Sequence, residues 1–459
     1  MARGTTKSAT KKSATKKSAV RKSVDADYGR GIFVDNQDQP TGRKSVIVTF
    51  KPKDKRPDEG KDKVEIVESA LESSEVTFFD AGTMPMGIAS FPASMSRESV
   101  GFDVNLYEAP IVVASLTDSE IKTLRNNRNV EAVEEDGQVY ALDDSSCFAE
   151  TGLPRRYQRL EQFQIEGQPS VQAETVPAGV SQIKAPGAWD SSRAKGIRVA
   201  VLDTGIDSAH PDIAPNYKGG ISFVPGQTPM DGNSHGTHCA GTIAAAINGA
   251  GVIGVAPAAS LYAVKVLDNS GSGQWSWLIA GINWCIQNKM MVLSMSLGGD
   301  SAPTALEAMC NAAWNNGLLL VAAAGNAGSA MGTVTVPGKY ANVIAVSAID
   351  SANVIAPFSS RGPEVELCAP GVNILSTIPG GGYGTKSGTS MACPHVSGAA
   401  ALAWGGHRWA NNVAIRRLLA WTSDNLGVPG RDPLFGYGRV DAEQAAGELA
   451  VPPVIPGIP

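Results

Sequence analysis

Short apolar runs alternate with helical stretches through residues 173–450, and this alternation restricts the fold more than any other feature of the sequence. The runs are Ile197–Leu202, Leu261–Val266, Val292–Met295, Leu318–Ala323 and Val343–Ser347, and the helical stretches are His235–Ile247, Trp275–Asn288, Ala302–Asn315 and Ser390–Trp404. Apolar runs without polar alternation are typical of strands buried on both faces, as in a parallel sheet covered by helices. The predicted fold class is therefore α/β, with functional groups expected at the carboxyl ends of the strands.

Three short motifs carry the residue types that nucleophilic catalysis needs. Asp203 follows the first apolar run in Ala-Val-Leu-Asp-Thr-Gly, His235 lies in Ser-His-Gly-Thr-His, and Ser390 lies in Gly-Thr-Ser-Met-Ala-Cys-Pro-His. A serine hydroxyl is protonated at neutral pH, so an imidazole must accept its proton during attack. A carboxylate must in turn hold that imidazole in the correct tautomer. The three motifs together predict a nucleophilic serine.

From about Val176 to Ala446 the chain resembles the subtilisin family of serine proteases. The order Asp, His, Ser is that of subtilisin-type folds, and further matching runs are Val180–Pro186, Gly254–Pro257, Ala263–Leu267, Ser296–Gly299, Ala323–Asn326 and Phe358–Ser360. The resemblance implies a serine endopeptidase that works through an acyl-enzyme intermediate. It makes Asp203, His235 and Ser390 the catalytic triad and Asn326 the side-chain donor to the oxyanion.

The single motifs also permit other interpretations. Asp-Thr-Gly is the signature of aspartic proteases, but the nearest second triplet, Asp268–Gly271, lacks the required spacing and setting. His235, His238 and Cys239 could bind zinc, although the run His-Glu-x-x-His of metalloproteases is absent. A further alternative is a catalytically silent binding protein with the subtilisin fold. The complete set of three motifs favours the protease.

The resemblance also implies a substrate groove and a calcium site. Protein and peptide substrates would lie as an extended strand along Gly271, Gly273, Trp275, Ser296, Leu297 and Gly298. Small residues around the first pocket predict broad specificity with an apolar preference. A structural Ca2+ would be held by the Asp212 carboxylate, the Asn248 side chain, the carbonyls of Ala246, Ala250 and Val252, and Glu174.

Residues 44–142 resemble the inhibitory propeptide of the same family. We expect strands at 44–50, 109–115 and 130–133 and helices at 63–71 and 117–126, the second opened by a capping box of Thr117 and Glu120. This order predicts a small α+β domain of ferredoxin-like type, which would act as chaperone and inhibitor. Residues 77–108 are interpreted as an insertion. A linker at 143–172, with self-cleavage expected after Leu142, leads to the catalytic domain at 173–450.

The two ends of the chain differ from the rest in composition. Residues 1–43 are predicted to be a disordered tail, and 1–23 hold eight Lys or Arg with no acid, so weak contact with nucleic acid or another anionic surface is conceivable. The net charge of -5 argues against such binding by the whole molecule. Residues 451–459 form a Pro-rich tail, expected to be extended and poorly ordered.

Targeting signals and cysteines give the remaining expectations. The sequence shows neither a signal peptide nor an apolar run long enough to span a membrane. A cytoplasmic location is therefore the default, with export by an unrecognised route left open. We expect a monomer. The six scattered cysteines are expected to be free thiols.

Overall fold

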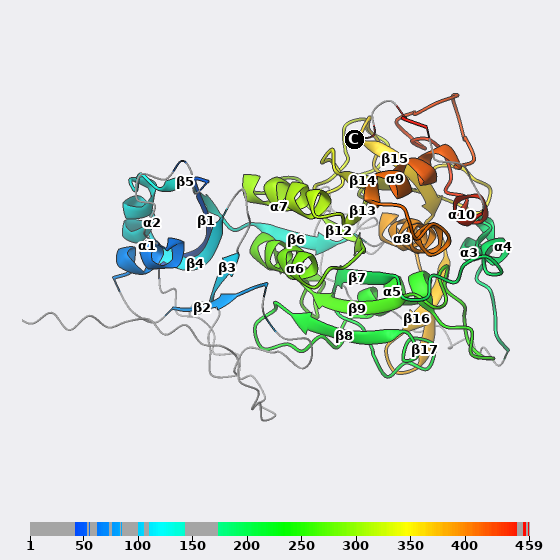
Figure 1. The fold of residues 1–459 in the computed structure, drawn as a ribbon, viewed down its shortest axis with the longest axis horizontal. Coiled ribbons are helices and arrows are strands. Elements are labelled where there is room, and N and C mark those ends of the chain that lie inside the picture. Colours follow the sequence, from blue (N-terminus) through cyan, green and yellow to red (C-terminus); the bar gives the residue numbers. More distant parts are fainter. Residues whose placement is uncertain are drawn as a thin grey trace, which may run out of the picture.

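The computed structural model describes residues 42–52, 55, 62–72, 76–82, 84, 100–104, 110–142, 173–447, 453–455 and 458. These residues form a small N-terminal part and a large C-terminal part, which lie side by side and are joined by a strand that runs from the first into the second (Figure 1). We call the large part the catalytic part, because it contains the predicted catalytic residues Asp203, His235 and Ser390. The predicted basic segment 1–23 and the predicted linker 143–172 lie outside the described residues. No helix among the described residues is long and apolar enough to cross a membrane.

The N-terminal part is a five-stranded sheet with two helices on one face. Its elements are β1 (Arg43–Phe50), α1 (Lys63–Ala70), β2 (Thr77–Asp80), β3 (Val100–Val104), β4 (Ile111–Thr117), α2 (Asp118–Arg125) and β5 (Val130–Glu135). The sheet order is β2-β3-β4-β1-β5, with β2 parallel to β3 and every other pair antiparallel. Without the edge strand β2, this is the arrangement of the split β-α-β, or ferredoxin-like, motif.

The start of α2 agrees with the expectation from the sequence, whereas the segment 77–108 does not. Thr117 Oγ1 accepts from the backbone N–H of Glu120 at 3.3 Å, and the Glu120 carboxylate accepts from the Thr117 N–H at 2.8 Å. The predicted capping box is therefore present. Residues 77–108, interpreted as an insertion, contribute both β2 and β3, because the apolar residues Phe79 and Phe102 are buried there.

The catalytic part is built on a seven-stranded parallel sheet, which confirms the predicted α/β fold. The strands are β7 (Arg198–Asp203), β8 (Tyr217–Ser222), β9 (Ser260–Lys265), β11 (Val292–Met295), β13 (Leu319–Ala323), β14 (Val343–Ile349) and β15 (Val365–Pro370), in the order β15-β14-β13-β11-β7-β9-β8. All six pairings are parallel. The carboxyl ends of the strands therefore meet at one edge.

Helices cover both faces of this sheet. Helices α5 (His235–Ala244) and α8 (Thr389–Gly406) pack together on one face, and α6 (Trp275–Gln287) and α7 (Thr304–Asn315) pack together on the other (Figure 1). The remaining elements are α3 (Ala178–Gln182), α4 (Ala185–Ala188), α9 (Asn412–Trp421), α10 (Ala442–Ala446) and the hairpin of β16 (Ile374–Ile378) and β17 (Gly382–Lys386). The sheet edge that carries the site is therefore supported from both sides.

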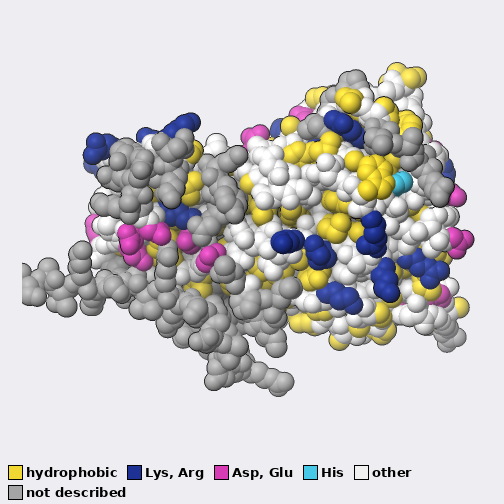
Figure 2. All heavy atoms as spheres, in the orientation of Figure 1, with side chains coloured by type: hydrophobic (Ala, Val, Ile, Leu, Met, Phe, Trp, Pro, Cys, Tyr) yellow, Lys and Arg dark blue, Asp and Glu magenta, His cyan; other side chains and the backbone are white. Residues whose placement is uncertain are grey.

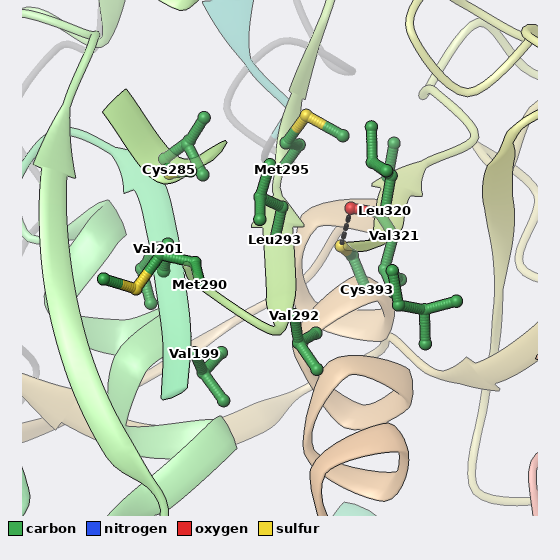
Figure 3. Close-up of a cluster of buried hydrophobic side chains, with 14 of the residues drawn as sticks. Val199, Val201, Cys285, Met290, Val292, Leu293, Met295, Leu320, Val321 and Cys393 are labelled. Carbon is green, nitrogen blue, oxygen red and sulfur yellow. Dashed lines mark hydrogen bonds between the residues drawn. The ribbon is translucent and has the colours of Figure 1, made fainter. Parts of the chain in front are cut away.

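The core of the catalytic part lies between the sheet and its helices. Figure 3 shows Val199 and Val201 of β7 beside Val292 of β11, with Cys393 of α8 close to Val321 of β13. The Cys393 thiol lies 3.6 Å from the Val321 carbonyl, and burial raises its pKa to about 12. The cysteines in the described residues, Cys239, Cys285, Cys310, Cys368 and Cys393, are buried free thiols, whereas Cys147 lies outside them. They act as packing residues rather than as disulfide partners.

Charged side chains are unevenly distributed on one face of the catalytic part. On the face shown in Figure 2, Lys and Arg side chains gather over the catalytic part, with Asp and Glu at its margins.

Of the predicted tail 451–459, only 453–455 and 458 are described. Ile458 is buried beside Tyr340 and Arg416. The expectation of an extended and poorly ordered tail stays a prediction.

Candidate active site

Asp203 and His235 meet at the carboxyl edge of the sheet. Asp203 is the last residue of β7 and His235 the first residue of α5, so the sheet and the helix hold them independently. The two carboxylate oxygens lie 2.7 and 2.9 Å from His235 Nδ1, and both residues are fully buried. Asp268, in the nearest triplet that an aspartic protease could use, instead accepts from the N–H groups of Ser270 and Ser272. The partner of Asp203 is therefore an imidazole.

The charge of this pair favours the protonated imidazole. Burial lowers the pKa of His235, but the adjacent Asp203 carboxylate outweighs it and raises the pKa well above its usual value. His238, in contrast, donates from Nε2 to the Ile374 carbonyl at 2.8 Å, and burial lowers its pKa to about 3. The two histidines therefore have separate partners, which does not support the zinc interpretation.

Ser390 lies in the first turn of α8. Gly388, the N-cap residue just before this helix, has φ of 146°, a backbone conformation that other residues rarely adopt. Ser390 Oγ donates to the Ser296 carbonyl at 2.9 Å and accepts from the Leu142 N–H at 3.1 Å. His235 Nε2 is buried and makes no hydrogen bond within the described part of the chain. The Ser390 hydroxyl is thus turned toward Ser296 and makes no hydrogen bond with His235 Nε2.

Cys239 lies beside both residues. Its thiol is 4.0 Å from His235 Nδ1 and 3.6 Å from the Ser390 carbonyl oxygen. The thiol is fully buried, and burial raises its pKa. The thiol therefore fills space between the histidine and the serine in its neutral form.

The carbonyl oxygen of Leu142 occupies an anion-binding position. It accepts from Asn326 Nδ2 at 2.9 Å and from the Ser390 N–H at 3.3 Å. The Asn326 side chain is oriented by Thr389, whose N–H and hydroxyl donate to Asn326 Oδ1 at 3.0 and 2.9 Å. Two fixed donors are therefore aimed at one carbonyl oxygen, which is the arrangement that stabilises a tetrahedral oxyanion.

The strand β6 (Gln138–Ala141) fills the groove that leads to this point. It pairs antiparallel with β10 (Ser272–Gln274) on one side and β12 (Leu297–Gly298) on the other. The Ala141 N–H donates to the Gly271 carbonyl at 2.9 Å, and the Leu142 N–H lies 3.3 Å from the Ser296 carbonyl. The Trp275 N–H donates to the Gly137 carbonyl at 3.1 Å. All six predicted groove residues, Gly271, Gly273, Trp275, Ser296, Leu297 and Gly298, therefore border this strand or the residues at its ends.

Glycines leave room for the bound side chains. A Cβ added to Gly298 would lie 3.0 Å from Leu142 Cδ1, and one added to Gly273 would lie 3.3 Å from Val139 Cγ1. Leu142 and Val139 are both buried. Apolar side chains therefore fit the two pockets only because the groove residues are small.

Comparison with known proteins now identifies the family. Residues 194–438 match the sequence profile of the Subtilase family. The chain belongs to this family. It is 52% identical over 279 residues to Subtilisin E of Bacillus subtilis (strain 168), covering 60% of this chain and 72% of that protein. It is 51% identical over 279 residues to Subtilisin of Bacillus pumilus (60% and 100%), and 49% identical over 275 residues to Subtilisin Savinase of Lederbergia lenta (60% and 99%). The protein is therefore a serine endopeptidase.

In this subtilase, the residues predicted to hold calcium lie together. Asp212 Oδ1 accepts from Asn248 Nδ2 at 3.0 Å, and Oδ2 accepts from the Val252 N–H at 2.9 Å and the Tyr383 hydroxyl at 3.0 Å. The Glu174 carboxylate accepts from the N–H groups of Asn248 and Gly249 at 2.7 and 2.8 Å. The loop that contains Ala246 and Ala250 thus meets one carboxylate, Asp212, through the Asn248 side chain and a second, Glu174, through backbone N–H groups.

Two buried polar residues of the subtilase site were missed in the sequence. Asp231 accepts from the Thr204 hydroxyl at 2.9 Å and from Thr237 N–H and Oγ1 at 2.9 and 2.6 Å, so it ties the Asp203 turn to α5. Lys265 donates to the Thr204 carbonyl and is fully buried. Lys265 could have been found in the sequence, because it is a lysine within the apolar run Leu261–Val266. Nothing in the sequence around Asp231 marks it, because its role depends on its contacts in the fold.

Proposed function

We propose that this subtilase cleaves peptide bonds with Asp203, His235 and Ser390, and that it is made as an inhibited precursor which cuts itself after Leu142. The observation that carries the proposal is the position of Leu142, with its carbonyl oxygen between Asn326 and the Ser390 N–H and its own N–H on Ser390 Oγ. A residue held in this way is bound as the acyl side of a scissile bond. Broad specificity with an apolar preference follows from the Leu142 and Val139 pockets.

The geometry supports a stepwise mechanism in which His235 moves the protons. Ser390 Oγ attacks the substrate carbonyl carbon while His235 Nε2 accepts the hydroxyl proton. Asp203 holds the imidazole through Nδ1 and stabilises its positive charge. The oxyanion accepts from Asn326 and the Ser390 N–H, the C–N bond breaks, and His235 returns the proton to the leaving amine. Water, deprotonated by the same imidazole, then releases the acyl group as a carboxylate and restores Ser390.

The N-terminal part supports the role of inhibitor and folding aid. Glu134 accepts from the N–H and hydroxyl of Thr304 at the start of α7, at 3.1 and 2.8 Å. Asp136 accepts from the Ser276 N–H at the start of α6 at 3.0 Å. Neither helix has a side-chain cap from its own N-cap residue. The N-terminal part therefore completes two helices of the catalytic part while β6 fills the groove.

We further propose that Asp212, Glu174, Asn248 and the carbonyls of Ala246, Ala250 and Val252 hold a structural Ca2+. The donor set fits this ion because it consists of hard oxygen ligands, two of them carboxylates, gathered around one loop. Rotation of the Asn248 amide by half a turn places its oxygen, in place of its nitrogen, toward Asp212. A bound Ca2+ would hold the ends of this loop to Asp212 without any part in the chemistry.

The function is tested with the wild type, Ser390→Ala and His235→Ala, each examined by intact mass and by casein hydrolysis. The wild type should lose its first 142 residues, digest casein and be blocked by phenylmethylsulfonyl fluoride. Both variants should stay uncut and inert, with activity at least about 10⁴-fold lower. Full activity of Ser390→Ala would contradict the mechanism, and an inert wild type would favour the silent binding protein.

A further inference from the structure

The amino edge of the parallel sheet, at which its strands begin, differs in charge from the carboxyl edge that holds the site. At the carboxyl edge, acids follow β9, β12 and β14, namely Asp268, Asp300 and Asp350. The connections that enter β7, β8, β9, β11 and β13 at the amino edge contain no acidic residue; they are residues 192–197, 213–216, 256–259, 288–291 and 316–318. The strands that they enter are neighbours in the sheet, so these connections lie along one edge.

Six cations gather at this amino edge. The Arg198 Nε donates to the Lys289 carbonyl at 2.8 Å, and the Arg408 guanidinium donates to the Lys195 carbonyl, which brings the loop after α8 to the same edge. None of the six forms an ion pair with a described residue, and all are exposed except Arg198, which is half-buried. We call this set the basic edge: Arg193, Lys195, Arg198, Lys218, Lys289 and Arg408.

The backbone at Lys289 does not favour a lysine. Its φ is 53°, in the left-handed region that glycine and asparagine adopt most easily. Its side chain is exposed, so packing does not favour a lysine there either. The positive charge is what this residue adds to the edge.

Trp409 adds a large apolar ring beside these cations. It follows Arg408 directly, is 61% exposed, and meets the ring of His407 edge to face with centroids 5.9 Å apart. An exposed indole next to lysines and arginines is typical of proteins at a bilayer surface. The indole lies there at the level of the headgroups, while the cations attract anionic lipids.

This arrangement fits a flat anionic surface better than a strand of nucleic acid. The cations come from several connections and are spread along an edge, whereas proteins that bind single strands line a groove with aromatic rings for successive bases. Among the described aromatic side chains, only Trp409 is more than half exposed. The basic edge therefore lacks the row of rings that such a groove requires in the described part of the chain.

We propose that the basic edge binds the headgroups of a bilayer that contains anionic lipids and holds the protein there without insertion of a helix. The acids at the carboxyl edge set the orientation, because the same lipid surface repels Asp268, Asp300 and Asp350. The groove between β10 and β12 then faces away from the bilayer. Substrates reach it from solution while the opposite edge stays on the lipid.

The test measures cosedimentation with vesicles of phosphatidylcholine mixed with phosphatidylglycerol, in the Ser390→Ala background so that self-cleavage does not change the sample. Lys195→Gln, Lys218→Gln and Lys289→Gln together should weaken binding about a hundredfold, since each cation near an anionic surface contributes roughly fivefold. Trp409→Ala should weaken it as well. Binding of the parent chain should fall in high salt and be absent on pure phosphatidylcholine.

A matched control removes the same number of exposed positive charges from the N-terminal part, by Lys122→Gln, Arg125→Gln and Arg128→Gln, and should bind as the parent does. Residues 1–23 are the same in every chain compared, so they cannot cause a difference. All substituted cations are exposed, so each variant should fold, which a thermal scan checks. Equal weakening by both triple variants, or no binding of the parent to the mixed vesicles, would overturn the proposal.

A single-stranded oligonucleotide serves as the competing ligand in the same assay. The lipid proposal predicts that Trp409→Ala lowers vesicle binding and that the triple variant of the basic edge affects vesicles more than the oligonucleotide. Loss of oligonucleotide binding with unchanged vesicle binding would identify nucleic acid as the partner and show that the lipid assignment is wrong.

Discussion

Lys265 is a buried lysine whose strand pairs with the one that ends at Asp203. Its ammonium donates to the Thr204 carbonyl and, at 3.0 Å, to Asn269 Oδ1. Burial lowers its pKa to about 8, although the nearby carboxylates of Asp231, Asp268 and Asp203 act in the opposite direction. A buried lysine is costly, and this one holds the turn that carries Asp203. We expect its charge to oppose protonation of His235 as well, because the imidazole contacts the same Asp203 carboxylate.

Lys265→Met should raise the pH at which the enzyme gains activity. Below pH of about 8, Lys265 carries a positive charge that opposes protonation of His235, which also faces Asp203 and Cys239. Without that charge the imidazole keeps its proton to higher pH. The acid limb of kcat/KM should therefore move upward by about half a pH unit. The control Asn269→Ala loses a hydrogen bond but keeps the charge, and an equal shift in both variants would contradict this explanation.

Single residues of the candidate site could be predicted from the sequence where they lie in motifs. Residues whose role depends on contacts with distant parts of the chain could not. Asp203, His235 and Ser390 each stand in a short run whose neighbours mark it. Asp231 is important because Thr204, 27 residues earlier, binds it. Such a pairing depends on the fold and leaves no local pattern.

The first turns of α6 and α7 depend on carboxylates from another part of the chain. Glu134→Gln and Asp136→Asn each remove a negative charge at a helix N-terminus, where it is worth about 0.3–1 kcal/mol. In the uncleavable Ser390→Ala background, each should lower the free energy of unfolding in urea by that amount. Glu131→Gln, an exposed carboxylate of β5, is the control. A loss of the same size in the control would show that the effect is not a property of the helix ends.

Calcium should stabilise the loop at 246–252. A ligand bound to the folded state adds RT ln(1 + [L]/Kd), so chelation should lower the Tm of the processed enzyme by several degrees. Asp212→Asn should lower the Tm in calcium to a similar degree and should make it insensitive to the chelator. The measurement is a thermal scan with and without chelator. An unchanged Tm of processed wild type on chelation would argue against the site.

Continuous apolar runs correctly predicted strands of the catalytic part. Strands whose sequences mix apolar residues with glycine or charged residues were not predicted. The five predicted strands of the catalytic part correspond to β7, β9, β11, β13 and β14. β8 was missed because Tyr-Lys-Gly-Gly-Ile-Ser contains two glycines and a lysine, and β3 because Val-Gly-Phe-Asp-Val mixes a glycine with an acid. Both are strands because neighbouring strands and packing stabilise them, which outweighs their weak intrinsic preference.

The whole catalytic part should fold slowly without its N-terminal partner. Neighbouring strands in its sheet come from distant sequence: Val199 of β7 pairs with Val292 of β11. Such long-range parallel pairing makes folding slow. We therefore expect denatured processed enzyme to regain activity at least about tenfold faster when the N-terminal part is added. Equal recovery with and without the added domain would contradict a role in folding.

The sequence predicted two domains but not that they share a core. Ile47, Phe102 and Leu142 belong to the same buried cluster as the residues around the parallel sheet. Periodicity shows which face of a strand is apolar, but the partner of that face is decided by the tertiary fold. The contact between the N-terminal sheet and α6 could therefore be found only in the structure.

Because β6 belongs to the same chain as the groove that it fills, we expect the proposed first cut to be a unimolecular event. Its half-time should be the same in a dilute and in a concentrated solution of the precursor. We expect destruction of the released N-terminal part to need an encounter with a free protease molecule, which would make that step bimolecular and faster at higher protein concentration. Because β6 lies between β10 and β12 of its own chain, the rate of the first step should not depend on protein concentration. The rate of the second step should increase with it.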